Sequence, residues 1–141
     1  MKVLLLTLTI LTSTIAAHAQ DAVVGKWWTP KRDGQIEVFR SAANTYFGKL
    51  IWGKTPGKKD DKNPEPALRS RDLIGINLFT GFTYDAGDRE WVDGKIYDPT
   101  SGKTYSCKLW LTDNNKTMNV RGYIGFSLLG RTEKFSRVEA P

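Results

Sequence analysis

Short runs of alternating apolar and polar residues recur along most of the chain, each bounded by Gly, Pro, Asp or Asn. β-Branched and aromatic residues are frequent in these runs, as is typical of strands with one buried face. Ile36 and Val38, for example, alternate with Gln35 and Glu37. The pattern predicts eight strands, at residues 23–29, 35–40, 45–52, 73–82, 90–97, 103–112, 116–123 and 131–138.

The links between these runs are mostly short and carry turn residues. Asp33 and Gly34 form a hairpin signal, and residues 98–102 and 113–115 are polar turns rich in Asp, Asn, Pro and Gly. Helical periodicity is absent from the sequence between them. Eight antiparallel strands with hairpin links favour a small up-and-down β-barrel, because closure removes exposed edges. An immunoglobulin-like sandwich is the alternative, although its two-cysteine framework is missing.

Residues 45–52 show how alternation assigns faces. Tyr46, Leu50 and Trp52 are expected on one side of this strand. Residues 53–70 then change to Lys, Asp, Asn and Pro, which predicts a long surface loop with a single helical turn near Ala67.

The first nineteen residues read as a secretory signal peptide. Lys2 precedes a mostly apolar run at residues 3–16, and Ala17 and Ala19 provide the small residues expected before a cleavage site. We therefore expect a signal peptide at residues 1–19, a single barrel domain at residues 20–141 and a periplasmic or secreted location. After signal removal, no apolar run reaches the roughly 20 residues that a transmembrane helix requires.

The composition limits the catalytic and metal-binding sites that this chain can form. The single histidine, His18, lies within the expected signal, so the mature chain has no histidine for a catalytic triad or a zinc site. Cys107 cannot form an intramolecular disulfide and shares a strand face with Leu109, which favours a buried thiol. We find no catalytic constellation, no metal site and no cofactor motif, and we expect the protein not to be an enzyme.

The tripeptide GKW at residues 25–27 resembles the signature that opens the first strand of lipocalins and other calycins. That resemblance implies a structural role for Gly25 and Trp27, with the indole plugging one end of the barrel. A cationic side chain from the last strand, Arg137 or Arg131, would then pack across the ring.

Further blocks resemble the exported bacterial family catalogued as domain of unknown function 2147. They are NPEPALRSR at 63–71 followed by LIG at 73–75, GKIYDP at 94–99 with GKTY at 102–105, and VRGYIG at 120–125 with LGRT at 129–132. The resemblance implies a lipocalin-like barrel of the bacterial envelope and brings no assigned activity.

A formal net charge of +6 favours anionic partners. Arginine can bind a carboxylate or phosphate through two parallel hydrogen bonds, and aromatic rings offer stacking surfaces. The candidate ligand-binding residues are therefore Arg69, Arg71, Arg121, Arg131, Trp52, Tyr97 and Tyr123. The alternative for these arginines is ion pairing with Asp72, Asp98 or Glu133, or stacking on tryptophan.

The expected function is binding of a small amphipathic or anionic molecule inside the barrel, without nucleic acid as a partner. The alternative is an envelope interaction protein with a filled barrel, which contacts an anionic envelope component through the basic loop at residues 54–71. The oligomeric state is left open.

Overall fold

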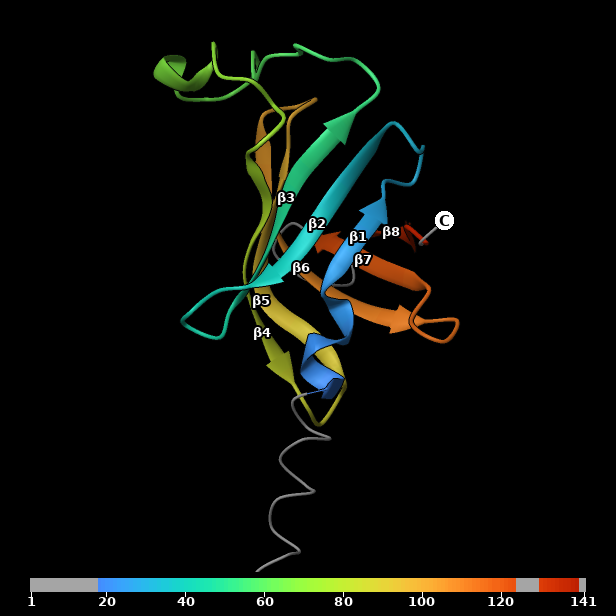
Figure 1. Cartoon of the computed structure of the whole chain (residues 1–141). Coiled ribbons are helices and arrows are strands. Elements are labelled where there is room, and N and C mark those ends of the chain that lie inside the picture. The colour runs from blue at the N-terminus through green and yellow to red at the C-terminus, as the bar shows by residue number, and fades with distance from the viewer. Residues whose placement is uncertain (1–17, 124–129, 140–141) are drawn as a thin grey trace, which may run out of the picture.

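The computed structural model describes residues 18–123 and 130–139, and the expected signal peptide lies outside this part of the chain up to residue 17. Eight strands form one closed barrel in chain order (Figure 1). The elements are η1 (Asp21–Val23), β1 (Gly25–Trp28), β2 (Gly34–Arg40), β3 (Tyr46–Gly53), η2 (Pro66–Leu68), β4 (Asn77–Asp85), β5 (Glu90–Asp98), β6 (Lys103–Thr112), β7 (Thr117–Tyr123) and β8 (Arg131–Arg137).

Every strand is antiparallel to its neighbours, and β1 pairs with β8 to close the barrel. Trp27 lies opposite Arg137 at this closure, and Trp28 lies opposite Ser136. The predicted up-and-down barrel of eight strands is confirmed, and the immunoglobulin-like sandwich is excluded. Among the described residues, no helix has the length and apolar character needed to cross a membrane.

The fourth strand begins later than the sequence pattern predicts. The apolar run starts at Leu73, but β4 starts at Asn77. Gly75 adopts a φ of 103°, and its amide donates to the carbonyl of Leu50 at 2.7 Å, so the chain turns here before entering the sheet. The apolar character of Leu73 instead reflects burial of a loop side chain.

Trp52 is on the opposite face of β3 from the one that alternation predicts. Gln35 pairs with Trp52 while the next residue, Ile36, pairs with Leu50, so Ile51 is an extra residue in β3. Such a bulge reverses the alternation beyond it. Tyr46 and Leu50 therefore face the core, whereas Trp52 points outward and is 43% exposed.

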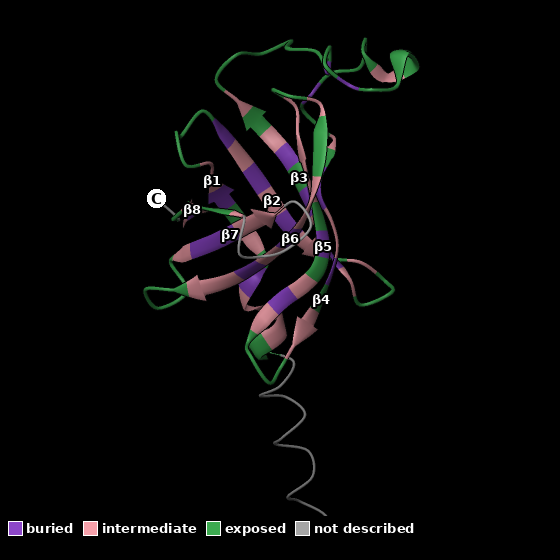
Figure 2. Cartoon of the chain, turned by 180° about the vertical axis from the view of Figure 1, so that it is seen from behind, coloured by how far each residue is buried: buried purple, intermediate pink, exposed green. Residues whose placement is uncertain are grey.

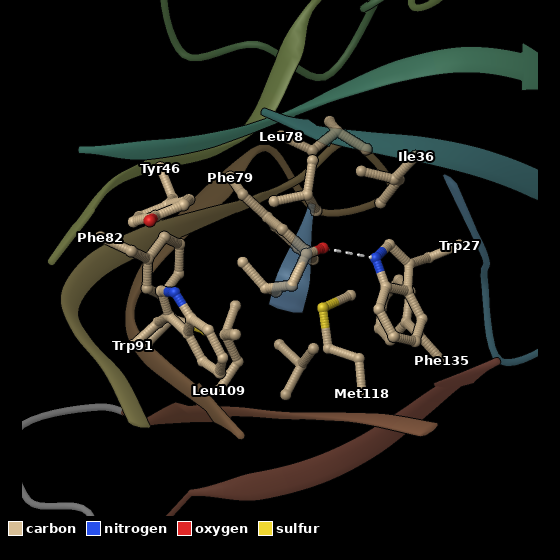
Figure 3. Close-up of a cluster of buried hydrophobic side chains, with 14 of the residues drawn as sticks. Trp27, Ile36, Tyr46, Leu78, Phe79, Phe82, Trp91, Leu109, Met118 and Phe135 are labelled. Atoms are coloured by element: carbon tan, nitrogen blue, oxygen red, sulfur yellow. Dashed lines mark hydrogen bonds between the residues drawn. The ribbon is translucent and has the colours of Figure 1, made fainter. Parts of the chain in front are cut away.

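Buried and more exposed positions alternate along β2 and the first part of β3 (Figure 2), as expected for strands with one face toward the barrel interior. Aromatic side chains fill much of this interior, and Figure 3 shows them gathered with Leu109 and Met118 in one cluster. The rings of Tyr46 and Trp91 pack edge to face at 6.3 Å between centroids. The space around these rings is too small to admit a water molecule, so this half of the barrel is solid.

The solid half ends at η1, which lies at the opposite end of the barrel from residues 54–76 (Figure 1). Trp27 is fully buried there, and its indole Nε1 donates to the carbonyl of Val23 at 2.9 Å. The guanidinium of Arg137 lies 4.1 Å from the Trp27 ring centroid and donates to the carbonyls of Ala22 and Val24. Of the two arginines considered for Trp27, Arg137 is the one in contact with the indole.

Gly25 belongs to the same contact. It has a φ of 136°, and a Cβ atom there would lie 2.8 Å from an Arg137 guanidinium nitrogen. A side chain at this position would therefore strain the backbone and push against the guanidinium.

Candidate functional site

The other half of the barrel contains a cavity of about 610 Å³ that opens between the strand ends. This volume lies within the range of roughly 300–1,000 Å³ that is usual for small-molecule sites. The turn at residues 29–33 and the turn after β5 border the opening, as do Tyr123 and Gly130, the described residues on either side of the β7–β8 connection. The cavity is thus built by several strands of one closed barrel and by the turns between them.

Apolar side chains form the deep part of the cavity. Five residues belong both to the buried core and to the cavity wall, namely Ile36, Leu78, Phe79, Val120 and Phe135. The rings of Phe79 and Phe135 pack edge to face with centroids 5.7 Å apart. The upper surface of the core is therefore the floor of the cavity, and it can bury an apolar group.

Aromatic hydroxyls and charges of both signs surround the opening. Tyr97, Tyr105 and Tyr123 contribute to the wall, and the charged lining residues are Lys31, Asp33, Asp98, Arg131 and Glu133. Arg131 Nε lies 2.8 Å from a carboxylate oxygen of Glu133, and the Arg131 side chain is 85% exposed. The opening can therefore hold a polar group by hydrogen bonds or by charge.

Asp98 remains ionised at this opening. Partial burial raises its pKa, but hydrogen bonds from the hydroxyls of Thr100 and Ser101 outweigh this effect, and the nearby Arg131 charge acts in the same direction. The net result is a pKa below the usual range of an aspartate. The opening therefore presents a fixed negative charge close to the guanidinium of Arg131.

Three of the sequence-predicted ligand residues line the cavity: Tyr97, Tyr123 and Arg131. Trp52 lies on the outer face of β3, as described above. Arg121 lies on β7 between inward-facing positions, and its guanidinium donates to the hydroxyl of Thr132 at 3.2 Å. The structure does not bring these two residues together with the other three.

The two remaining arginines hold the long loop at residues 54–76 together. Arg69 Nε donates to the carbonyl of Asn63 at 2.7 Å, and Arg71 Nε lies 3.0 Å from a carboxylate oxygen of Asp60. Asp72, considered as an arginine partner, instead binds Lys59. The arginines of this loop thus have structural contacts and lie outside the cavity wall.

Asp60 is the centre of the loop, and sequence reasoning gave it no role. Its side chain is fully buried and accepts hydrogen bonds from Tyr97, Asn63 and Arg71. Burial raises the pKa of this carboxyl, but the three donors outweigh burial and leave the pKa below its usual value. Burial, together with the hydrogen bond to Asp60, raises the pKa of Tyr97 to about 12.

These contacts fix the loop beside the cavity opening, since Tyr97 both binds Asp60 and lines the wall. The β5–β6 turn packs against the loop as well. A Cβ atom on Gly102 would lie 1.9 Å from the carbonyl oxygen of Lys62, and Gly102 has a φ of 74°. Glycine is therefore required at this position for the loop to approach the barrel so closely.

The described part of the chain offers little for metal binding or for thiol chemistry. No group of three or more His, Cys, Asp or Glu side chains is arranged to hold a metal ion within residues 18–123 and 130–139. Cys107 is fully buried, and burial raises the pKa of its thiol to about 12. This thiol is an inert core group near neutral pH.

Comparisons with known proteins match this chain to a family and to a solved fold. A family model described as "Uncharacterized protein conserved in bacteria (DUF2147)" matches residues 25–137. Among solved structures, a protein from the human pathogen Helicobacter pylori, described as belonging to the lipocalin family, is similar with a TM-score of 0.73. The two chains are 23% identical, and the match covers 83% of each. No curated protein matches the chain.

Proposed function

This chain belongs to the bacterial family of uncharacterized conserved proteins DUF2147, and from its lipocalin-like barrel we propose that it binds a small amphipathic molecule. The observation that carries the proposal is the cavity of about 610 Å³ above the solid half of the barrel. A cavity that opens between strand ends gives a ligand direct access from solvent.

The cavity has an apolar floor and a polar, charged opening, and this arrangement favours an amphipathic ligand over a purely anionic one. Its floor is the apolar surface formed by residues such as Phe79 and Phe135, which would bury a hydrocarbon or aromatic group. The opening has carboxylates at Asp98 and Glu133 near the guanidinium of Arg131. Repulsion from these carboxylates would oppose a ligand of high negative charge, whereas one polar head group could bind Arg131 and the tyrosine hydroxyls.

We propose further that the protein is exported and acts after loss of residues 1–19. Contacts with the barrel support this boundary, because the Gln20 carbonyl accepts a hydrogen bond from Trp91 Nε1 at 3.0 Å. Asp21 accepts a hydrogen bond from the Tyr46 hydroxyl at 2.8 Å, and Val23 is buried in the core. Cleavage before Gln20 would therefore retain the segment that ends the solid half.

The first experiment is recovery of the protein from the periplasm of its native host, followed by intact mass measurement and denaturation. We expect a mature chain that begins at Gln20 and the release of a small amphipathic compound in about equal molar amount. Periplasmic protein that retains residues 1–19 would contradict cleavage before Gln20, and protein found only in the cytoplasm would contradict export. Folded protein that releases nothing and binds no amphipathic probe would contradict the binding proposal.

A second experiment tests the cavity with fluorescent probes. Gly122 lines the wall, and a Cβ atom there would lie 3.6 Å from the nearest Ile96 methyl carbon, an ordinary contact. We expect Gly122→Leu to occupy part of the cavity and weaken binding of N-phenylnaphthylamine by roughly tenfold. Gly122→Ala is the matched control and should bind nearly as the unchanged protein does. If Gly122→Leu binds the probe as tightly as the unchanged protein does, the probe binds outside this cavity.

A further inference from the structure

Two tryptophan side chains pack together on the outer surface near the cavity opening. Among the described residues, the large hydrophobic side chains with high exposure are Val24, Trp52 and Ile74, at 39%, 43% and 41%. Ile74 lies across β3 from Trp52, because Gly53 follows Trp52 in the strand and a Cβ atom on Gly53 would be 4.0 Å from the terminal methyl carbon of Ile74. Trp52 packs edge to face against Trp28 at 5.8 Å between centroids. We call Trp28 and Trp52 the tryptophan patch.

The tryptophan patch lies at the same end of the barrel as the cavity opening. Trp28 ends β1 and leads directly into the turn at residues 29–33, which lines the opening. This turn is tied to the end of β3, because the Lys54 amide donates to the Asp33 carbonyl at 2.9 Å. Figure 1 shows the ends of β1 and β3 on the side of the barrel from which residues 54–76 project.

Positive charge surrounds the tryptophan patch. The guanidinium of Arg32 lies 5.5 Å from the Trp28 ring centroid, and Lys31 and Lys54 are exposed on the adjoining segments. The turn at residues 29–33 and the end of β3 up to Lys54 together carry these three cations and one carboxylate, Asp33. Indole rings beside basic side chains are suited to the interface of a bilayer, where the rings lie among head groups and the cations meet anionic phosphates.

We infer that the protein docks on anionic phospholipid membranes through the tryptophan patch, with the cavity opening next to the bilayer surface. The small size of the patch favours a lipid surface over a protein partner. A stable protein interface takes about 20–30 residues from each side, whereas interfacial insertion of indole rings needs no matching surface. This docking is independent of whether the cavity holds a ligand.

The test is sedimentation of the full mature barrel with lipid vesicles. We expect binding to vesicles that contain phosphatidylglycerol, weak binding to phosphatidylcholine alone, and a loss of affinity as salt is raised. Trp52→Ala should lower the affinity for anionic vesicles by about tenfold or more. Lys54→Glu should lower it as well, since it replaces a cation beside the patch with an anion.

Two matched controls lie at the opposite end of the barrel. Val24→Ala removes an equally exposed apolar side chain, and Lys116→Glu makes the same charge change beside Arg137. Both should bind vesicles as the unchanged protein does, and circular dichroism should show that all variants are folded. The inference is overturned if the unchanged protein ignores anionic vesicles, if folded patch variants bind normally, or if the controls lose as much affinity. It is also overturned if the patch captures a protein while vesicles are ignored.

Discussion

At Asp60, a single carboxylate determines whether a long surface loop has a fixed position. The side chain is fully buried and accepts hydrogen bonds from Tyr97 of the barrel and from Asn63 and Arg71 of the loop itself. Removing the charge while keeping the shape leaves these donors poorly satisfied, at a cost of about 1–3 kcal/mol. We expect Asp60→Asn to increase amide hydrogen exchange across residues 54–76 at pH 7. Asp61→Asn changes an exposed neighbour and should have little effect.

Asp60 should also make the stability of the loop at residues 54–76 depend on pH. The pKa of Asp60 is lower in the folded protein than the value of about 3.9 in an unfolded chain, so its ionised form stabilises the fold. This stabilisation is fully present above about pH 4 and is lost as the pH falls through the lowered folded value. The protection of amides in residues 54–76, measured relative to their intrinsic exchange rates at each pH, should therefore fall on acidification below pH 4. Asp60→Asn should show a smaller change over that range, and an identical change would contradict the assignment.

At the scale of one strand, the bulge at Ile51 can be tested by two neighbouring substitutions. Leu50 faces the core and is 9% exposed, whereas Trp52 faces outward. We expect Leu50→Ala to lower the free energy of unfolding by about 2–5 kcal/mol. Trp52→Ala should lower it by less than about 1 kcal/mol, although tryptophan is the larger side chain. Urea unfolding of both variants measures the difference. A larger loss of unfolding free energy for Trp52→Ala than for Leu50→Ala would contradict the bulge at Ile51.

The strands themselves were well predicted from the sequence, because alternation and turn residues act locally. The run at residues 103–112 coincides with β6, and the helical turn expected near Ala67 is η2. The departures have non-local causes. Trp52 changes face because one extra residue is accommodated against β2, and β4 starts late because residues before it pack on β3.

The site was predictable only in part for a related reason. Of the ligand residues proposed from the sequence, Tyr97, Tyr123 and Arg131 line the cavity, and their binding of a ligand stays a prediction. Arg69 and Arg71 carry the same chemistry but bind within the loop, and no local pattern distinguishes the two situations. The roles of Asp60 and of Phe135, which belongs to both core and cavity wall, depend on closure of the barrel. Such roles arise from contacts between distant segments.

At the scale of the whole molecule, the reactivity of the Cys107 thiol shows whether the barrel is folded. Its thiol is buried between strands that pair along their lengths, and its pKa is raised to about 12. We expect the native protein not to react with an aromatic disulfide reagent at pH 8, and complete reaction after unfolding in guanidinium. The rate of labelling should follow global opening measured by tryptophan fluorescence. Fast labelling of native protein, with fluorescence unchanged, would contradict burial of this thiol.

The closure between β1 and β8 has a mechanical consequence. Strands β2 and β3 pair from Gly34 to Arg40, whereas β1 pairs with β8 at Trp27 and Trp28. A pulling force applied through the first and last strands would load this short junction directly and peel the two strands apart. The indole of Trp27 and the guanidinium of Arg137 would bear that load, since they join the same strands. Under such a force, the pairing between β1 and β8 should therefore separate before any other pair of strands.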